Sequence, residues 1–172
     1  MRLALEEAQQ AFYAGQFPVG CVLVVGDEVM ATGGRENSDI PFSELDHAEI
    51  VALRNLQSKY PEIDLEQVVI YSTLEPCLMC YSTLLVNRVS TIVYGFEDVM
   101  GGGTNLPIDQ LAPLYNGREI TVVKNILRDE CLYLFQQFFK NPLNTYLKNT
   151  LLAQYTLEQE CDLQTIRPIR DQ

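Results

Sequence analysis

The sequence predicts an α/β domain of three layers, in which helices cover a β-sheet. Short β-branched apolar runs alternate along the chain with segments whose apolar residues recur at helical spacing. This alternation is typical of a sheet whose later strands are parallel and joined by crossover helices. The 172 residues are enough for one domain with a substantial core.

The first half of the chain is expected to contain two helices on either side of a β-hairpin. The helices are predicted at residues 3–14 and 47–58, and the hairpin strands at 19–25 and 29–32. Gly26-Asp27 supplies the turn between the two strands. A polar loop then leads to the second helix.

The second half is expected to hold three further strands and two helices before residue 140. The strands are predicted at 68–73, 90–94 and 120–124, and the helices at 77–87 and from about residue 127.

A C-terminal extension is predicted after this domain. Asn141-Pro142 indicates a helix start, and an apolar stripe follows it at Leu143, Tyr146, Leu147, Leu151 and Tyr155. We therefore expect residues 1–140 to form the main domain, and residues 141–172 to add a C-terminal helix and a tail.

The composition disfavours several classes of protein. The chain carries 12 Lys and Arg against 23 Asp and Glu, a formal net charge of −11, which disfavours generic binding to nucleic acid or to an anionic membrane. No apolar run approaches the roughly 18 residues of a membrane-spanning helix, and the first residues do not resemble a secretory signal. The odd number of cysteines, five, disfavours a complete disulfide framework. We expect a soluble cytoplasmic protein without membrane contact.

One histidine and two cysteines form a candidate metal site. His47 is the only histidine of the chain, and Cys77 and Cys80 follow thirty residues later, three apart at the start of a predicted helix. One imidazole and two thiolates suit zinc and leave a fourth position for water, whose pKa zinc lowers to about 7. Asp46 is expected to cap the helix that begins at His47. Glu49, in its first turn, is the natural proton shuttle.

Two short motifs carry a family resemblance. His47-Ala48-Glu49 together with Pro76-Cys77-Leu78-Met79-Cys80 resembles the signature of zinc nucleobase deaminases, the cytidine and deoxycytidylate deaminase superfamily. Phe17-Pro18-Val19-Gly20, the longer string 73–80 and Asp129-Glu130-Cys131 are similar to the tRNA-specific adenosine deaminases of bacteria, and guanine deaminases share much of the pattern. The resemblance runs from about residue 3 to residue 140.

The resemblance implies a site and a fold. It assigns zinc ligation to His47, Cys77 and Cys80, and proton transfer to Glu49. Substrate contacts are implied for the backbone N–H of Ala48 and for Asn37, although Asn37 stands about one residue closer to the histidine than in the family. The implied cytidine-deaminase-like fold has a five-stranded mixed sheet with helices on both faces, and we expect a homodimer.

Two departures bear on the substrate. The tRNA enzymes end in helices rich in Lys and Arg, whereas residues 141–172 hold three basic and four acidic side chains, and Ser43-Glu44-Leu45-Asp46 is acidic. We therefore expect a hydrolytic deaminase that releases ammonia from a free nucleobase, nucleoside or related small heterocycle. Adenosine in tRNA is the alternative substrate, disfavoured by charge. A non-catalytic zinc-stabilised module that binds a partner through residues 141–158 is a different class of alternative.

Several other residues have two interpretations. A purely structural zinc would need a fourth ligand such as Cys21 or Cys131, but both lie on apolar stretches, which favours core packing. The glycine run 101–103 lacks the Lys-Ser/Thr of a phosphate-binding loop, so a flexible connection is favoured over a lid. Glu97 and Asp98, just before it, are either solvated carboxylates or partners of purine N–H groups.

Overall fold

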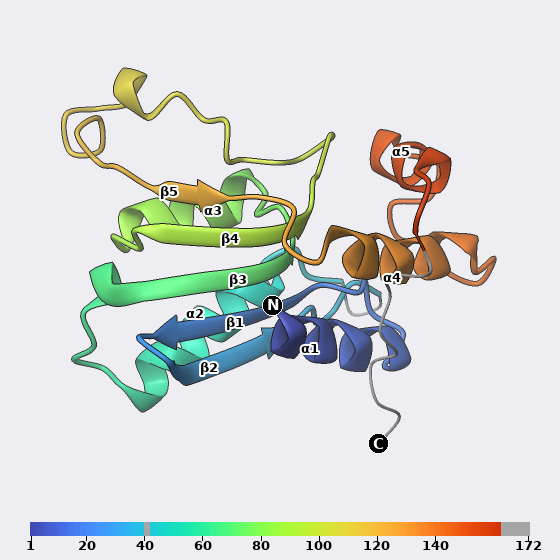
Figure 1. Ribbon diagram of the computed structural model, residues 1–172, viewed down its shortest axis with the longest axis horizontal. Coiled ribbons are helices and arrows are strands. Elements are labelled where there is room, and N and C mark those ends of the chain that lie inside the picture. Colours follow the sequence, from blue (N-terminus) through green and yellow to red (C-terminus); the bar gives the residue numbers. More distant parts are fainter. Residues whose placement is uncertain (40–41, 163–172) are drawn as a thin grey trace.

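A five-stranded mixed sheet with helices on both faces forms the body of the protein (Figure 1). The computed structural model describes residues 1–39 and 42–162. The strand order is β2-β1-β3-β4-β5. The strands are β1 (Gly20–Val25), β2 (Glu28–Gly34), β3 (Val68–Leu74), β4 (Thr91–Phe96) and β5 (Thr121–Val123). The predicted fold class is thereby confirmed.

Only β1 runs opposite to the other four strands of the sheet. β1 pairs antiparallel with β2 and with β3, whereas β3, β4 and β5 run parallel. The hairpin β1–β2 needs only the short turn at Gly26-Asp27, while each parallel pair needs a crossover. The predicted hairpin and the parallel later strands are both present.

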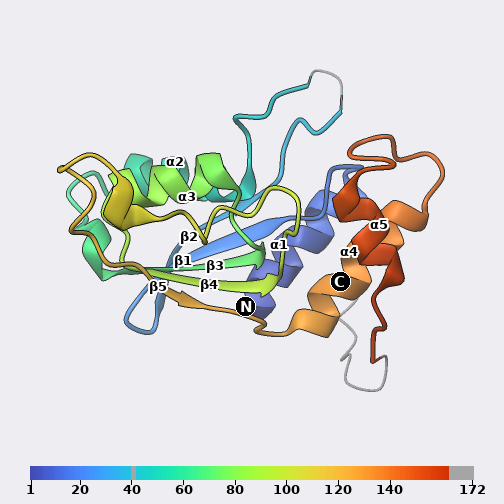
Figure 2. The same cartoon turned by 90° about the horizontal axis from the view of Figure 1, so that it is seen from above.

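Helices cover both faces of this sheet (Figure 2). α2 and α3 lie on one face, and α1 and α4 lie on the other, with α5 against α4. The helices are α1 (Arg2–Tyr13), α2 (Ala48–Lys59), α3 (Leu78–Val86), α4 (Arg128–Lys140) and α5 (Leu151–Glu158). Two short 3-10 turns, η1 (Leu65–Gln67) and η2 (Ile108–Gln110), lie in connections.

A glycine in β2 sets the approach of α2 to the sheet. A Cβ at Gly33 would lie 2.6 Å from the backbone nitrogen of Ala52 and 2.7 Å from the carbonyl oxygen of Ala48. Any larger residue would push α2 outward. Because His47 immediately precedes α2, this contact also fixes where the histidine stands relative to the sheet.

The C-terminal helix begins later than the sequence predicts. Residues 141–150 form turns instead of a helix from Asn141-Pro142, with left-handed backbone at Leu147 and Asn149 (φ 55° and 64°). α5 starts after Thr150, whose hydroxyl accepts a hydrogen bond from the Ala153 backbone at 3.4 Å. The prediction was wrong because the apolar residues of 141–150 do not form one helical face: Tyr146, for example, packs its ring against Phe17 at 5.3 Å.

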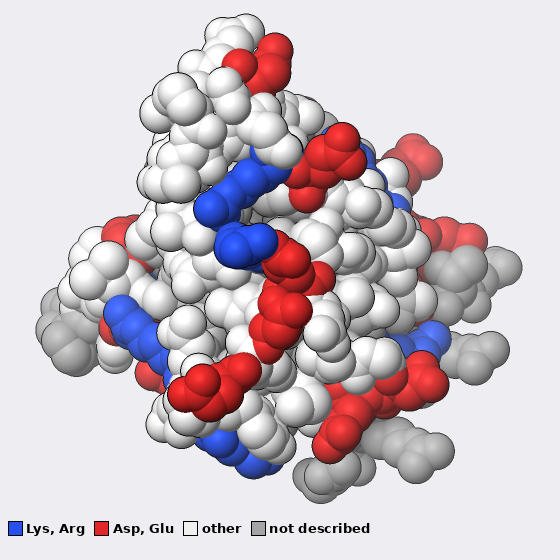
Figure 3. All heavy atoms as spheres, turned by 90° about the vertical axis from the view of Figure 1, so that its left-hand side faces the viewer, with Lys and Arg blue, Asp and Glu red and all other residues white. Residues whose placement is uncertain are grey.

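The surface carries charges of both signs without a broad basic area on the face that Figure 3 shows. There, at the end of the molecule away from α4 and α5, Lys and Arg lie in small groups among Asp and Glu. Among the described residues, no helix has the length and apolar character needed to cross a membrane.

Candidate metal and active site

Two helix N-termini on the same face of the sheet bring the predicted metal ligands together. His47 is the N-cap of α2 and Cys77 is the N-cap of α3, and Cys80 lies one turn into α3. β3 runs directly into the loop before α3, so the sheet holds both cysteines beside α2 (Figure 2). The positive ends of two helix dipoles therefore meet at this point, which favours thiolates.

The geometry of these three side chains fits a tetrahedral zinc site. Their ligand atoms all lie within 4.8 Å of one another, and His47 Nδ1 is 3.5 Å from the Sγ atoms of both Cys77 and Cys80. Zinc bonds of about 2.0–2.1 Å to nitrogen and about 2.3 Å to sulfur at a tetrahedral angle place N and S about 3.6 Å apart. The nitrogen–sulfur separations are thus those expected around one shared zinc ion.

The two cysteine side chains differ in pKa. The hydrogen bond from Cys80, reinforced by His47, lowers the pKa of Cys77 to about 4 in spite of burial. The same hydrogen bond and burial raise the pKa of Cys80. Cys77 is therefore the thiolate of the pair, and a divalent cation would displace the proton that Cys80 retains.

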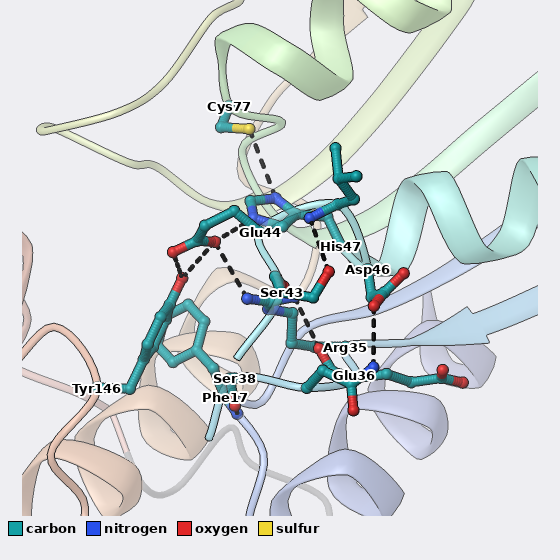
Figure 4. Close-up of polar contacts among 12 residues, drawn as sticks. Phe17, Arg35, Glu36, Ser38, Ser43, Glu44, Asp46, His47, Cys77 and Tyr146 are labelled. Carbon is teal, nitrogen blue, oxygen red and sulfur yellow. Dashed lines mark hydrogen bonds and ion pairs between the residues drawn. The ribbon is translucent and has the colours of Figure 1, made fainter. Parts of the chain in front are cut away.

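Glu44 orients the histidine. Its Oε2 accepts a hydrogen bond from His47 Nε2 at 2.9 Å, which leaves Nδ1 facing the two sulfurs (Figure 4). Burial alone lowers the pKa of His47, but hydrogen bonds with Cys77 and Glu44 raise it to about 9. Carboxylates of this kind fix the tautomer and the ring orientation of metal-binding histidines. The acidity of residues 43–46 is evident from the sequence, but this role of Glu44 was not predicted, although Glu44 and His47 stand at i, i+3 spacing.

Asp46 does not cap α2, contrary to expectation. Its carboxylate accepts hydrogen bonds from Asn37 Nδ2 at 2.9 Å and from Arg54 at 3.2 Å, and no side-chain cap is formed at His47. Asn37, nine residues earlier in the same loop, takes up the Asp46 carboxylate in place of the local cap.

Glu49 is buried beside the cysteines. It is 3% exposed, and burial raises the pKa of its carboxyl group above the ordinary value. Ser72 Oγ donates to Oε1 at 3.3 Å, and Cys80 Sγ donates to Oε2 at 3.5 Å. A buried carboxyl group with a raised pKa beside the candidate metal ligands is suited to general acid–base chemistry.

A small cavity connects these groups. Its volume is about 60 Å³, which is about the volume that two water molecules occupy in the liquid. Most ligand pockets have volumes of several hundred cubic ångströms. The turns after α4 and the start of α5 contribute Tyr146, Leu147 and Leu152 to its wall. The remaining lining residues are Phe17, Val19, Arg35, His47, Ala48, Glu49, Leu74, Glu75, Cys77 and Asp98.

The other candidate substrate residues divide between the cavity and its surroundings. Ala48 and Asp98 line the cavity, whereas Asn37 is not among its lining residues and adopts left-handed backbone with φ of 52°. Glu97 is not a lining residue either, because it pairs with Arg128 and accepts a hydrogen bond from Tyr155 at 2.6 Å. Of the two carboxylates before the glycine run, only Asp98 reaches the site.

The glycine run packs against the metal site. A Cβ at Gly103 would lie 2.8 Å from Leu78 Cα and 2.9 Å from the Cys77 carbonyl oxygen. The Gly103 backbone N–H donates to the Pro76 carbonyl at 2.9 Å. The run is therefore a close approach that supports the cysteine loop rather than a free connection.

The remaining buried cysteines belong to the core. Cys21 and Cys131 are both 0% exposed and lie in the hydrophobic cluster. Within residues 1–39 and 42–162, the group of His, Cys, Asp and Glu side chains able to share a metal ion is that of His47, Cys77 and Cys80. Neither core cysteine supplies a fourth ligand, which leaves that position open.

Residues 1–96 match the family model of the cytidine and deoxycytidylate deaminase zinc-binding region. The chain belongs to this deaminase family. It is accordingly a zinc-dependent deaminase, a hydrolase that acts on C–N bonds other than peptide bonds. The expected zinc cofactor agrees with the His/Cys/Cys group.

Two tRNA-specific adenosine deaminases are similar to this chain along most of its length. The tRNA-specific adenosine deaminase of Buchnera aphidicola subsp. Schizaphis graminum is 31% identical over 82% of this chain and 92% of its own. That of Haemophilus influenzae is 32% identical, covering 81% of each chain.

Solved structures give the same fold. A structure from a study of A-to-I editing by tRNA:A34 deaminases at the wobble position of transfer RNA has a TM-score of 0.66 and 27% identity, covering 78% of this chain and 96% of that one. A guanine deaminase from Nitrosomonas europaea has a TM-score of 0.63 at 24% identity, covering 78% and 80%, a likeness of fold alone.

Proposed function

We propose that this deaminase acts on a free amino-bearing nucleobase, nucleoside or related small heterocycle. The observation that carries the proposal is the closure of the cavity by the C-terminal segment, defined as residues 141–158. Tyr146, Leu147 and Leu152 of this segment line the cavity beside His47 and Glu49. A small molecule can be enclosed there after a local movement, whereas a folded RNA loop needs an open approach.

The charges around the cavity support the same substrate class. The cavity is lined by Glu49, Glu75 and Asp98, and Glu44 is hydrogen-bonded to His47 beside it. Burial raises the pKa of Asp98, while its carboxylate accepts hydrogen bonds from two backbone N–H groups of the following loop. Carboxylates accept hydrogen bonds from amino and ring N–H groups, but they repel phosphates.

In this proposal His47, Cys77 and Cys80 hold the zinc ion. Zinc with three protein ligands lowers the pKa of water in its fourth position to about 7. Glu49 accepts a proton from the attacking water and delivers it to the leaving nitrogen, so that ammonia departs. Ser72 holds the Glu49 carboxylate in place through its hydroxyl, and the backbone N–H of Ala48 contacts the base. Asn37, whose Nδ2 donates to Asp46, is the further substrate contact of this proposal.

We also propose that the protein forms a homodimer. Leu78 and Val86 on α3 are 55% and 53% exposed, and such apolar side chains support packing in a homodimer. Light scattering of the purified protein measures the mass directly.

Adenosine in tRNA is the second candidate, favoured by the relatives that are about 30% identical over four fifths of the chain. Two assays on the same zinc-loaded protein separate the candidates. Ammonia release is measured on a panel of purines, pyrimidines and their nucleosides, and inosine formation is measured in bulk tRNA. Ammonia release from a free heterocycle without inosine formation supports the proposal, and activity on tRNA alone overturns it.

A further inference from the structure

A buried arginine in the cavity has a hydrogen-bond donor to spare. Arg35 follows β2, is 2% exposed and lines the same cavity as His47 and Glu49. Its Nε has no hydrogen-bond partner, and within the described part of the chain it is the one buried side-chain nitrogen or oxygen in that condition. Native proteins rarely leave such a group unsatisfied, because an unmade buried hydrogen bond costs free energy.

The other contacts of Arg35 hold the guanidinium still. Nη1 donates to the carbonyl oxygens of Glu36 at 2.7 Å and Ser43 at 2.8 Å, and Nη2 donates to Glu44 Oε2 at 3.1 Å (Figure 4). The guanidinium carbon also lies 5.5 Å from the ring centroid of Tyr146 in the C-terminal segment. Because these partners fix the group from several sides, the Nε–H is a donor of set position.

The charges of the cavity limit what this donor can bind. Glu44 pairs with the guanidinium, and the other ionisable lining groups besides His47 and the Cys77 thiol are the Tyr146 phenol and the carboxyl groups of Glu49, Glu75 and Asp98. An anionic substituent such as phosphate or carboxylate would meet more negative than positive charge there. A neutral oxo oxygen accepts the Nε–H bond without this repulsion.

We propose that Arg35 is a specificity-determining residue whose Nε–H donates to an oxo oxygen on the substrate ring, so that the enzyme selects neutral amino-oxo heterocycles. This inference rests on the proposed function, because it requires a free heterocycle in the cavity. The carboxyl groups of Glu75 and Asp98 would face the ring's N–H donors, while Arg35 supplies the donor that recognises the acceptor.

The test compares substrates that differ in the oxo group and in the ring N–H beside it. Cytosine is paired with 4-aminopyrimidine and guanine with 2-aminopurine, and kcat/KM is measured by ammonia release for whichever pair the wild type converts. The oxo preference is the kcat/KM of the oxo substrate divided by that of its partner without the oxo group. The oxo preference of Arg35→Lys is then divided by that of the wild type, so that the intrinsic reactivity of the two substrates cancels. Lysine keeps a positive charge near Glu44 but has no Nε–H. We expect the preference to fall about 10- to 100-fold, as for the loss of one hydrogen bond to a charged group.

Arg128→Lys is the matched control. Arg128 pairs with Glu97 and does not line this cavity, so its replacement should leave the oxo preference unchanged. A loss in Arg35→Lys that is equal for both members of a pair would reveal a merely structural role and overturn the inference. A failure to convert any free base, with inosine formed in tRNA, would instead overturn the proposed function.

Binding to the wild type keeps the inference testable if Arg35→Lys does not fold. Hypoxanthine differs from purine by the 6-oxo group and the N1–H beside it, and neither carries an amino group to be released. Their inhibition constants against the reacting substrate should differ at least tenfold in favour of hypoxanthine. Equal constants would overturn the assignment of Arg35.

Discussion

Replacing Leu152 tests whether the C-terminal segment is part of the site or merely rests on it. Leu152 is 1% exposed, belongs to the hydrophobic core and borders the cavity. Leu→Ala substitutions in cores cost about 2–5 kcal/mol, and the cost grows by about 24 cal/mol per Å³ of space left empty. Here the vacated space joins a cavity lined by Arg35, Glu75 and Asp98, which water can enter, so we expect a cost of about 2–3 kcal/mol.

Leu143→Ala supplies the control within the same segment. Leu143 is 85% exposed, so its truncation should change the free energy of unfolding by less than about 0.5 kcal/mol. Urea unfolding followed by circular dichroism measures both variants, since the chain has nine tyrosines but no tryptophan. The zinc concentration is held constant, because bound metal adds to the apparent stability.

Activity provides the second readout for Leu152→Ala. The enlarged cavity should raise kcat/KM for bicyclic relative to monocyclic substrates by about tenfold, the scale of one or two methylenes in an apolar pocket. Equal stability of the two leucine variants, with an unchanged substrate ratio, would refute the reasoning that the segment walls the site.

Three further predictions concern the metal, the proton shuttle and pH. Glu49→Gln should keep about one zinc per chain by elemental analysis but lower kcat by a factor of about 10² to 10⁴, the usual contribution of general acid–base catalysis. Cys77→Ala should lose the zinc, because one of three protein ligands is gone, and a variant that retains stoichiometric metal would contradict the ligand assignment. Glu97→Gln should destabilise the protein by up to about 1 kcal/mol at pH 7, since the Arg128 pair is partly exposed. The Glu97 pKa is lowered because hydrogen bonds from Arg128 and Tyr155 outweigh its burial. The difference in free energy of unfolding between the wild type and Glu97→Gln is therefore present above about pH 4.3, and it disappears as the pH falls through the lower folded-state pKa. Urea titrations at several pH values measure it.

Local patterns in the sequence predicted the sheet and the metal group well. The β-branched runs form the strands: a short turn joins the paired β1 and β2, and a crossover through α3 joins the paired β3 and β4. The gathering of the three candidate ligands was predictable because His47 lies at the start of α2 and Cys77 and Cys80 lie at the start of α3, where spacing along the chain fixes position in space.

Features that depend on distant residues were not predictable in this way. The helix start at Asn141-Pro142 failed because Tyr146 is drawn to Phe17 and to Glu44, a hydrogen bond across 102 positions. The Asp46 cap failed because Asn37 takes up the carboxylate. The role of Arg35 needed the cavity itself, since nothing in the sequence distinguishes it from an exposed arginine.

The contacts of the acidic segment 43–46 give it a different role from the one expected from the sequence. From the sequence, Glu44 and Asp46 were charges that would repel a phosphate backbone at the pocket mouth. In the structure Glu44 accepts hydrogen bonds from His47, Arg35 and Tyr146 at 2.9–3.1 Å, so it joins a metal ligand, a cavity arginine and the C-terminal segment. Its pKa is lowered because these hydrogen bonds outweigh burial, and the carboxylate therefore stays charged at neutral pH. A net charge of −11 says little about any one site, but a single carboxylate with three such partners links the shape of the pocket to the orientation of the histidine.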